Sequence, residues 1–239
     1  MRTIFAFIVL IVLVRLAVRQ DELPVPGICG ISTIKPKTSS RIVNVGYYEN
    51  GTAKFYCGAN LITAKHVLTA IHCVVGNDAQ YIRIHFALHN FTSNVLKPEN
   101  GIPAQRYVSH ESHNSGRLTN DVAVIRLQVP VAVDNLKVGL VCLINSASSK
   151  LKYDDPVIGD PNQPSSSRPV ELQQVVLQYA DATYPDCKSL THLLNFVKEL
   201  SKICACGQYQ RVCNGGPLVR EKSLPDGTEY FEQVGRGVS

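Results

Sequence analysis

Three short segments of this sequence carry residue types that could take part in covalent chemistry. The first ends in His72, the second contains Asp121, and the third reads CNGGPL at residues 213–218. Nucleophilic catalysis needs a hydroxyl or a thiol beside a base such as histidine. Asn214 cannot attack, because the lone pair of its amide nitrogen is delocalised into the carbonyl, so Cys213 is the only nucleophile in the third segment. A lone histidine beside a cysteine, or an aspartate before a strand, is a weak signal.

Metal chemistry has little support in the sequence. Cys204 and Cys206 are separated by one residue, which is tighter than the usual spacing of zinc ligands. The sequence has no second Cys/His pair that would complete a zinc site with them. The segment HESH at residues 110–113 sits among Asn, Ser and Gly, which favours a solvated loop. We therefore expect no metal site and no cofactor.

The chain has the composition of a globular protein, so folded elements can position these residues. The chain has 239 residues, of which 45% are hydrophobic and 18% are charged, enough for one large domain or two small ones. Its formal charge is +5, and three arginines of residues 1–20 contribute to it, so the remainder carries 5 − 3 = +2. No basic face is visible, so we expect no nucleic-acid partner.

The first twenty residues are typical of a secretory signal peptide. Arg2 precedes an unbroken apolar run from Ile4 to Val14, which is shorter than the roughly twenty residues that a membrane-spanning helix needs. The alternative is a signal anchor that stays in place. We expect residues 1–20 to be removed, leaving a secreted, extracellular chain without a membrane contact.

Cysteines and glycosylation sequons agree with a secretory route. Asn50-Gly51-Thr52 and Asn90-Phe91-Thr92 are acceptor sequons for N-linked glycans. An even number of cysteines in a secreted chain indicates disulfides. The eight are Cys29, Cys57, Cys73, Cys142, Cys187, Cys204, Cys206 and Cys213.

Apolar patterning predicts a β-rich fold. Short alternating runs such as residues 55–63, 81–88, 121–133, 171–180 and 230–239 are separated by turn-forming stretches, which favours a sandwich or a barrel. One segment, near residues 187–200, has the three- and four-residue spacing of a short helix. Residues 21–41, rich in proline and serine, are interpreted as an extended leader.

The segment CGANLITAKHVLTAIHCV at residues 57–74 resembles the trypsin/chymotrypsin-like serine protease family around its catalytic histidine. TNDVAVIRL at 119–127 and GGPL at 215–218 are similar to two further segments of that family, in the same order. The resemblance implies that His72 and Asp121 are the catalytic histidine and its orienting aspartate, and that Cys57 bridges Cys73. It also implies two antiparallel β-barrels, the second truncated at the C-terminus, with His72 and Asp121 both from the first barrel and facing the junction.

The leader resembles an arthropod-type secreted zymogen, in GICG and SSRIVNVG. That resemblance implies cleavage between Arg41 and Ile42, with the leader held by Cys29–Cys142. Residues 21–41 would be the propeptide and 42–239 the peptidase domain, incomplete at its C-terminus. A further pair, Cys187–Cys204, would flank the expected helix.

Departures from the family gather around the third segment. Asn214 stands where the family has its nucleophilic serine, and Val212 replaces the glycine whose N–H helps to form the oxyanion hole. The aspartate that receives the new N-terminus after cleavage has no match. A cysteine nucleophile would stand immediately before Gly-Gly, so Cys213 is one residue too early, and Cys206–Cys213 remains a possible bridge.

Three functional interpretations follow from the resemblance. The first is a secreted, catalytically inactive homologue that binds protein partners, such as proteases, inhibitors or cascade components, in an extracellular proteolytic cascade. The second is an active serine endopeptidase whose recorded sequence is incomplete or mis-spliced. The third is the product of a decaying gene that folds poorly. We expect the first.

Overall fold

The structure is a computed structural model, and its description covers these residues: 23–31, 42–87, 97–116, 119–135, 137–143, 156–159, 161–162, 175–180, 204–206, 211–212 and 217–236. The helix expected near residues 187–200 and the signal peptide expected at 1–20 lie outside these ranges. Within them the helices are single 3-10 turns, η3 (Ile71–Cys73), η4 (Ala79–Tyr81) and η5 (Pro98–Asn100). Among the described residues we found no helix with the length and apolar character to cross a membrane.

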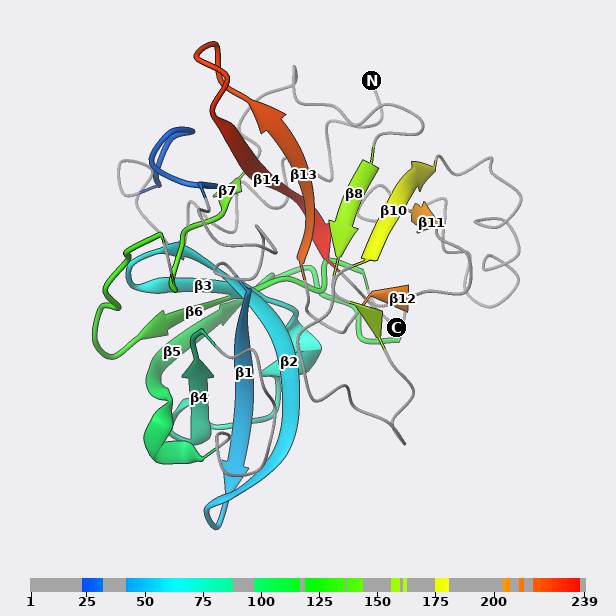
Figure 1. Cartoon of the computed structure of the whole chain (residues 1–239). Helices are drawn as coiled ribbons and strands as arrows, with labels where there is room; N and C mark the ends of the chain where they lie inside the picture. The colour runs from blue at the N-terminus through cyan, green and yellow to red at the C-terminus, as the bar shows by residue number, and fades with distance from the viewer. Residues whose placement is uncertain are drawn as a thin grey trace.

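The first half of the chain forms a closed barrel of six antiparallel strands (Figure 1). Around the barrel the strands follow the order β1-β2-β3-β6-β5-β4. Their bounds are β1 (Ile42–Glu49), β2 (Thr52–Thr63), β3 (His66–Thr69), β4 (Ile82–His85), β5 (Ile102–Ser109) and β6 (Ala123–Leu127).

Strand alternation gives this barrel two buried faces. Leu61, Val67 and Ile125 belong to the core cluster of the barrel and are fully buried. Their neighbours on the same strands point the other way. Ile62, Leu68 and Val124 form a second cluster with Val219 and Phe231 of the second sheet, so the outer face of the barrel is the junction between the two halves.

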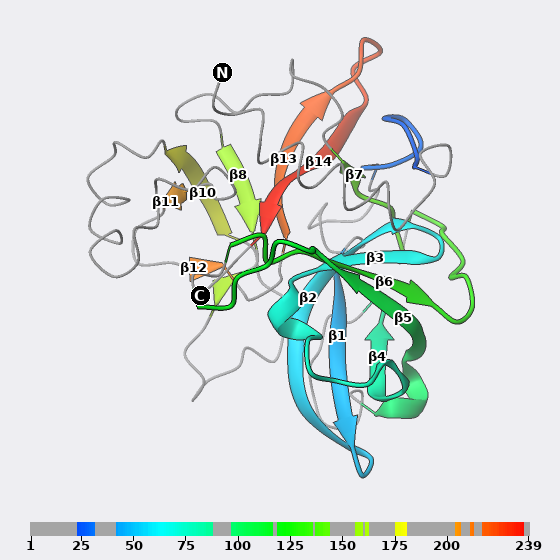
Figure 2. The same ribbon diagram turned by 180° about the vertical axis from the view of Figure 1, so that it is seen from behind.

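The second half contains a six-stranded sheet in the order β11-β10-β8-β13-β14-β7 (Figure 2). Neighbouring strands are antiparallel except β7 and β14, which pair in parallel through two residues each. Among the described strands this sheet is open, and a separate pair is formed by β9 and β12. The bounds are β7 (Cys142–Leu143), β8 (Pro156–Gly159), β9 (Pro161–Asn162), β10 (Val175–Ala180), β11 (Cys204–Cys206), β12 (Arg211–Val212), β13 (Pro217–Ser223) and β14 (Glu229–Arg236).

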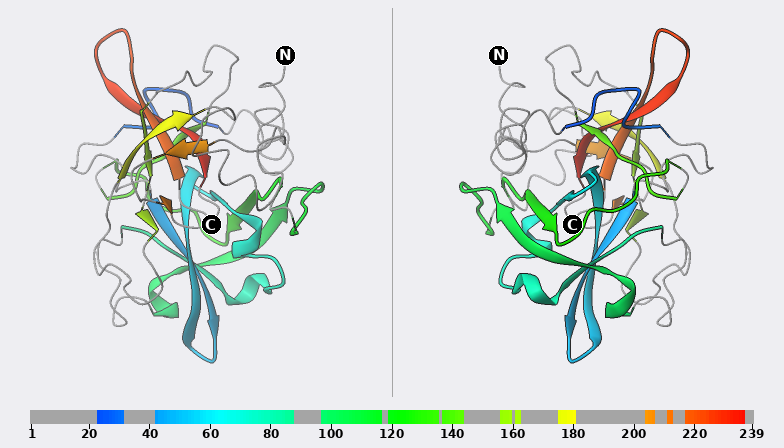
Figure 3. Two further views of the ribbon diagram at one scale, coloured as in Figure 1. Left: turned by 90° about the vertical axis from the view of Figure 1, so that its right-hand side faces the viewer. Right: turned by 90° about the vertical axis from the view of Figure 1, so that its left-hand side faces the viewer.

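The two halves lie side by side, as the turned views also show (Figure 3). The fold expected from the sequence, an all-β protein with the two-part architecture of the trypsin-like fold, is confirmed. The first barrel is closed, and the described part of the second half is the open sheet.

The leader residues Cys29 and Gly30 are buried in the protein, whereas residues 25–28 are exposed. Cys29 is fully buried and forms a disulfide with Cys142 of β7. The N–H of Gly30 donates to the carbonyl of Leu140 at 2.7 Å, and its own carbonyl accepts from the N–H of Phe231 at 3.1 Å. Gly30 has a φ of +77°, and a Cβ there would lie 2.6 Å from the carbonyl oxygen of Phe231. Only glycine fits this crossing, because both the conformation and the space exclude a side chain.

Candidate active site

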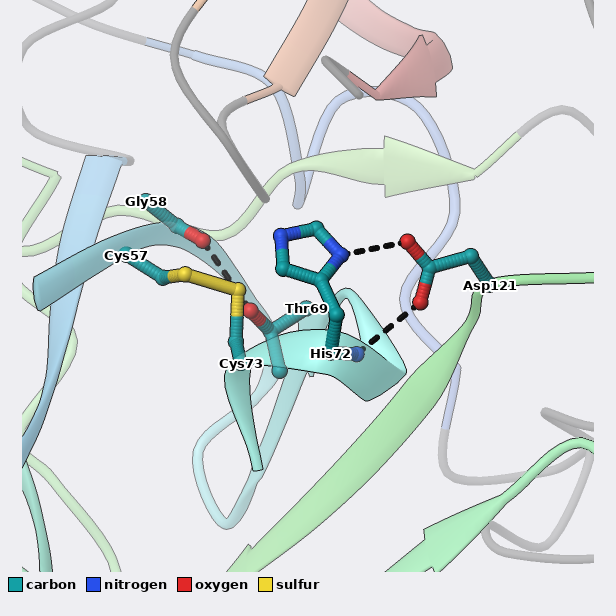
Figure 4. Close-up of a disulfide and its surroundings, with 6 residues drawn as sticks. All are labelled: Cys57, Gly58, Thr69, His72, Cys73 and Asp121. Carbon is teal, nitrogen blue, oxygen red and sulfur yellow. Dashed lines mark hydrogen bonds and ion pairs between the residues drawn. A yellow bond between two sulfur atoms is a disulfide. The ribbon is translucent and has the colours of Figure 1, made fainter. Parts of the chain in front are cut away.

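A strand end, a hydrogen bond and a disulfide hold the segment that carries His72. β3 ends at Thr69, and the single turn η3 follows directly. The hydroxyl of Thr69 donates to the carbonyl of Gly58 on β2 at 3.0 Å. The disulfide Cys57–Cys73 then ties the residue after His72 to the same strand (Figure 4). These bonds fix the turn against the barrel and set the direction of the histidine ring.

Asp121 lies two residues before β6 and orients both the backbone and the ring of His72. One carboxylate oxygen accepts from the backbone N–H of His72 at 3.0 Å, and the other lies 2.5 Å from its Nδ1 (Figure 4). The Asp121 side chain is 2% exposed and that of His72 is 24% exposed. A carboxylate only accepts hydrogen bonds, so this contact favours the tautomer with its hydrogen on Nδ1.

The other ring nitrogen of His72 is available as a base. Nε2 is buried, and it makes no hydrogen bond to the described part of the chain. With the hydrogen on Nδ1, Nε2 carries the lone pair that can accept a proton. The pair can therefore act as an oriented general base, provided that a hydroxyl, a thiol or a water is placed beside it.

A histidine and two sulfurs come close together at this turn, but they do not make a metal site. The Sγ atoms of Cys57 and Cys73 and one ring nitrogen of His72 lie within 4.8 Å of one another. The two sulfurs are bonded to each other, and a metal binds the thiolate form of cysteine. The trio is therefore explained by the disulfide.

Some of the other residues singled out in the sequence are placed by the structure. Ile42 is the first residue of β1 and pairs with Asn60. Asn50 lies at the turn between β1 and β2. Val212 lies in β12 and pairs with Pro161. Cys204 and Cys206 lie in β11. Outside the described residues are Arg41, Asn90, Cys187, Cys213 and Asn214.

Sequence reasoning missed two residues that support the site and one that holds the leader. Thr69 and Gly58 form the hydrogen bond that anchors the turn, and Gly30 allows the leader to cross β14. A threonine shortly before a candidate histidine carries no signal of its own. Gly30 directly follows a cysteine expected in a disulfide, and that position was a clue to a crowded crossing.

Comparisons with known proteins agree with this geometry. The Trypsin family model matches residues 29–235. Chymotrypsin-C of Mus musculus is 31% identical over 213 residues, which cover 80% of this chain and 76% of the mouse protein. Chymotrypsin-C of Rattus norvegicus is 34% identical over 124 residues, covering 45% and 44% of the two chains.

A solved structure has the same fold. The crystal structure of the scabies mite inactivated protease paralogue S-D1 matches with a TM-score of 0.63 and 18% identity, covering 85% of this chain and 91% of that one. At this identity the likeness concerns the fold alone. Together with the match over residues 29–235, the sequence and the paired His72 and Asp121 identify the chain as a member of the trypsin/chymotrypsin-like serine protease family.

Proposed function

We propose that this protein is a secreted member of the trypsin family that does not cut peptide bonds and acts by binding a protein partner in an extracellular proteolytic cascade. In this proposal residues 1–20 are a signal peptide, residues 21–41 are a leader and residues 42–239 form the peptidase domain. The partner is a protease, a protease inhibitor or another component of the cascade.

The observation that carries the proposal is that the base is oriented while the sequence lacks the family's nucleophilic serine. His72 and Asp121 are held as an oriented base, whose Nε2 makes no hydrogen bond to the described residues. At the position of the family's nucleophilic serine, directly before Gly215 and Gly216, the sequence has Asn214. Without the hydroxyl no acyl-enzyme can form, and loss of the serine alone costs about 10⁶ in turnover at a comparable protease site.

Two further features support inactivity. Val212 stands where the family has the glycine of the oxyanion hole, and a β-branched residue lacks the backbone freedom of glycine. The sequence also has no match for the aspartate that would bind the amine of Ile42 after cleavage. Cleavage after Arg41 is therefore expected to leave the protein inactive.

Secretion is supported by the apolar run at the N-terminus and by the disulfides. Cys29–Cys142 and Cys57–Cys73 are both buried, and such bonds are typical of proteins that fold in oxidising compartments. A binding role is supported by what the fold retains. The two halves pack through a shared apolar cluster, which keeps the two-part architecture of the trypsin-like fold together. The structural neighbour described as an inactivated protease paralogue is a precedent for this fold without catalysis.

Peptide-ester hydrolysis is the direct test of inactivity. The chain from Gln20 to Ser239 is expressed, cleaved after Arg41 and assayed on arginine and aromatic peptide esters, with His72→Ala as the matched control. We expect the same background rate for both proteins and no labelling by a fluorophosphonate. Hydrolysis that the fluorophosphonate abolishes would contradict the inactivity, because Asn214 and not a serine occupies the site in the expressed chain. Hydrolysis lost in Cys213→Ala would support a cysteine nucleophile.

Binding is tested separately, by calorimetry against active trypsin-family proteases and against protein inhibitors of such proteases. We expect saturable binding to one of these classes by the cleaved or the uncleaved chain. The control is the reduced protein, whose Cys29–Cys142 and Cys57–Cys73 bonds are open. A folded, oxidised chain that binds neither class would contradict the binding role and leave the inactivity result intact.

A further inference from the structure

The turn between β1 and β2 has the geometry of a tight hairpin with an asparagine at its tip. Glu49 pairs with Thr52, which leaves Asn50 and Gly51 as the only two residues of the loop. Their φ angles are +51° and +74°. Positive φ at both central positions defines the type I′ turn, which favours Asn-Gly because few other pairs adopt it without strain. The local sequence therefore explains the shape of the tip.

The tip is open to solvent. Glu49, Asn50 and Gly51 are all exposed. A Cβ built on Gly51 would have no atom within 4 Å. The hairpin forms the end of the barrel that points away from the second sheet in every view (Figures 1 and 3). A large group on the Asn50 side chain would therefore displace nothing in the fold.

The same three residues, Asn50-Gly51-Thr52, are an acceptor sequon for an N-linked glycan. We propose that Asn50 carries an N-linked oligosaccharide. The inference rests on the secretory route of the proposed function. The amide nitrogen of Asn50 forms a bond to C1 of an oligosaccharide and loses one proton. The bond from C1 to the pyrophosphate of a polyisoprenyl carrier breaks, so the donor is a lipid-linked oligosaccharide.

The position of the glycan limits how a partner can approach. Thr52 lies five residues before Cys57 on β2, so the tip is roughly 16 Å along the strand from the disulfide beside His72. A glycan there covers the hairpin end of the barrel and leaves the turn of His72 accessible. The partner is therefore expected to bind at the face that includes the junction of the two halves.

The test is to secrete the full chain from cultured animal cells in two forms. One keeps its own first twenty residues, and the other has them replaced by a signal peptide of established activity. Each is digested with peptide:N-glycosidase F in heavy-oxygen water, which converts a glycosylated asparagine into a heavy-oxygen-labelled aspartate. We expect a labelled residue 50 and a loss of apparent mass on the gel.

Two matched variants assign the glycan. Thr52→Ala keeps Asn50 but destroys the sequon, and Asn50→Asp keeps a residue that tolerates positive φ but removes the acceptor amide. Both should lose the enzyme-dependent label at residue 50 and run below the untreated parent by the mass of one glycan, while a glycan at the second sequon, Asn90, would remain. Asn-Gly also deamidates spontaneously and takes up heavy oxygen during the incubation, so a sample incubated without the enzyme gives the baseline. An unmodified Asn50 in the secreted protein would overturn the proposal, as would labelling no greater than this baseline. Labelling only with the replacement signal would uphold the glycan and contradict the native secretory route.

Discussion

The first barrel and the second sheet differ in how completely each is held by its own strands. In the first barrel each strand has two neighbours, because the sheet closes on itself. The described second sheet is open, and its edge strand β7 pairs with β14 through only two residues. Beside β7 the leader supplies Gly30, whose carbonyl binds the backbone of Phe231. Part of the second sheet's edge is therefore hydrogen-bonded to the leader, which precedes the first barrel in the chain.

The same difference separates the two halves of the candidate site. His72 and Asp121 both come from the first barrel, and so do the hydrogen bonds between them and the Thr69 and disulfide bonds that hold the turn of His72. The Gly-Gly-Pro-Leu segment enters β13 of the second sheet. Loss of the nucleophile would therefore leave these described bonds of the histidine in place.

The largest expected effect comes from the leader disulfide. Cys29–Cys142 spans 113 residues and Cys57–Cys73 spans 16. Because a longer loop loses more conformational entropy in the unfolded chain, removing the first bond should cost about 5 kcal/mol and removing the second about 3 kcal/mol. The measurement is urea unfolding of the double variants Cys29→Ala/Cys142→Ala and Cys57→Ala/Cys73→Ala. A larger loss in the free energy of unfolding on removing Cys57–Cys73 would show that the leader disulfide is not the main disulfide contribution to stability.

Gly30→Ala tests whether the edge contact of the leader matters apart from its disulfide. The substitution forces alanine to a φ of +77° and drives its Cβ into the backbone of Phe231. The left-handed conformation and the overlap together should cost about 3 kcal/mol in the free energy of unfolding. Gly76→Ala is the matched control, because Gly76 has a φ of +80° and open space around it. Its cost should be about 1 kcal/mol.

Equal losses for Gly30→Ala and Gly76→Ala would mean that the leader shifts away from β14 without penalty. In that case the second sheet would be as independent as the first barrel, and the comparison between them would fail.

The strands could be predicted from the sequence where alternation coincided with burial. The run at 121–133 predicted a strand, and β6 occupies Ala123–Leu127. The alternation continues beyond it, but Pro130 has no N–H for a ladder, and no strand is present from 128 to 134. Residues 66–74, HVLTAIHCV, also form an apolar run, and this run divides into β3 and the turn η3. Hydrophobic pattern alone does not show where a chain must turn.

The site was identified through resemblance, and its supporting contacts were not. His72 and Asp121 are 49 residues apart, and their separation in space depends on how β3 pairs with β6. The strand propensities of individual residues do not predict which strands pair. The second bond of Asp121, to the backbone N–H of His72, depends on the local turn. Such contacts are determined by tertiary geometry, which no single segment encodes.

Acid should destabilise the first barrel through His85. Burial, and then the nearby charge of Arg83, lower the pKa of His85 from 6.5 to about 4. Between these values the unfolded chain binds a proton that the folded chain does not, so folding loses stability as pH falls from about 6.5 to 4. The full loss is about 3 kcal/mol. Above pH 6.5 the group is neutral in both states and contributes no pH dependence.

The variant His85→Gln isolates this effect. Glutamine does not titrate, and its carbonyl can still accept from the hydroxyl of Tyr48, which lies 2.7 Å from Nε2 of His85. Burial also lowers the pKa of His110, so some acid sensitivity remains in the variant. Unfolding free energies measured from pH 4 to 7 should therefore show a smaller slope for His85→Gln. An unchanged slope would place the acid sensitivity elsewhere, outside the barrel's interior.

Asp121→Asn tests whether the Asp121 carboxylate orients His72 in the half-site of the first barrel. An asparagine has one acceptor oxygen in place of two, so one of the two charge-assisted bonds to His72 is lost. The expected cost is about 2 kcal/mol in the free energy of unfolding. Asp78→Asn is the control, because exposed Asp78 also accepts from two N–H groups, both of Gln80, and asparagine caps a turn equally well. Its cost should be near zero.

The stability change alone would fit a purely structural aspartate, so the tautomer of His72 is the deciding measurement. If the asparagine carbonyl keeps the backbone N–H of His72, its NH₂ faces Nδ1 and donates to it. The ring hydrogen then moves to Nε2, and the lone pair that could accept a proton there is lost. Nitrogen NMR of the imidazole above pH 7 distinguishes the two forms. A shift from Nδ1–H to Nε2–H in Asp121→Asn, with none in Asp78→Asn, would show that the Asp121 carboxylate maintains the oriented base. A ring with the same tautomer in all three proteins would contradict that role.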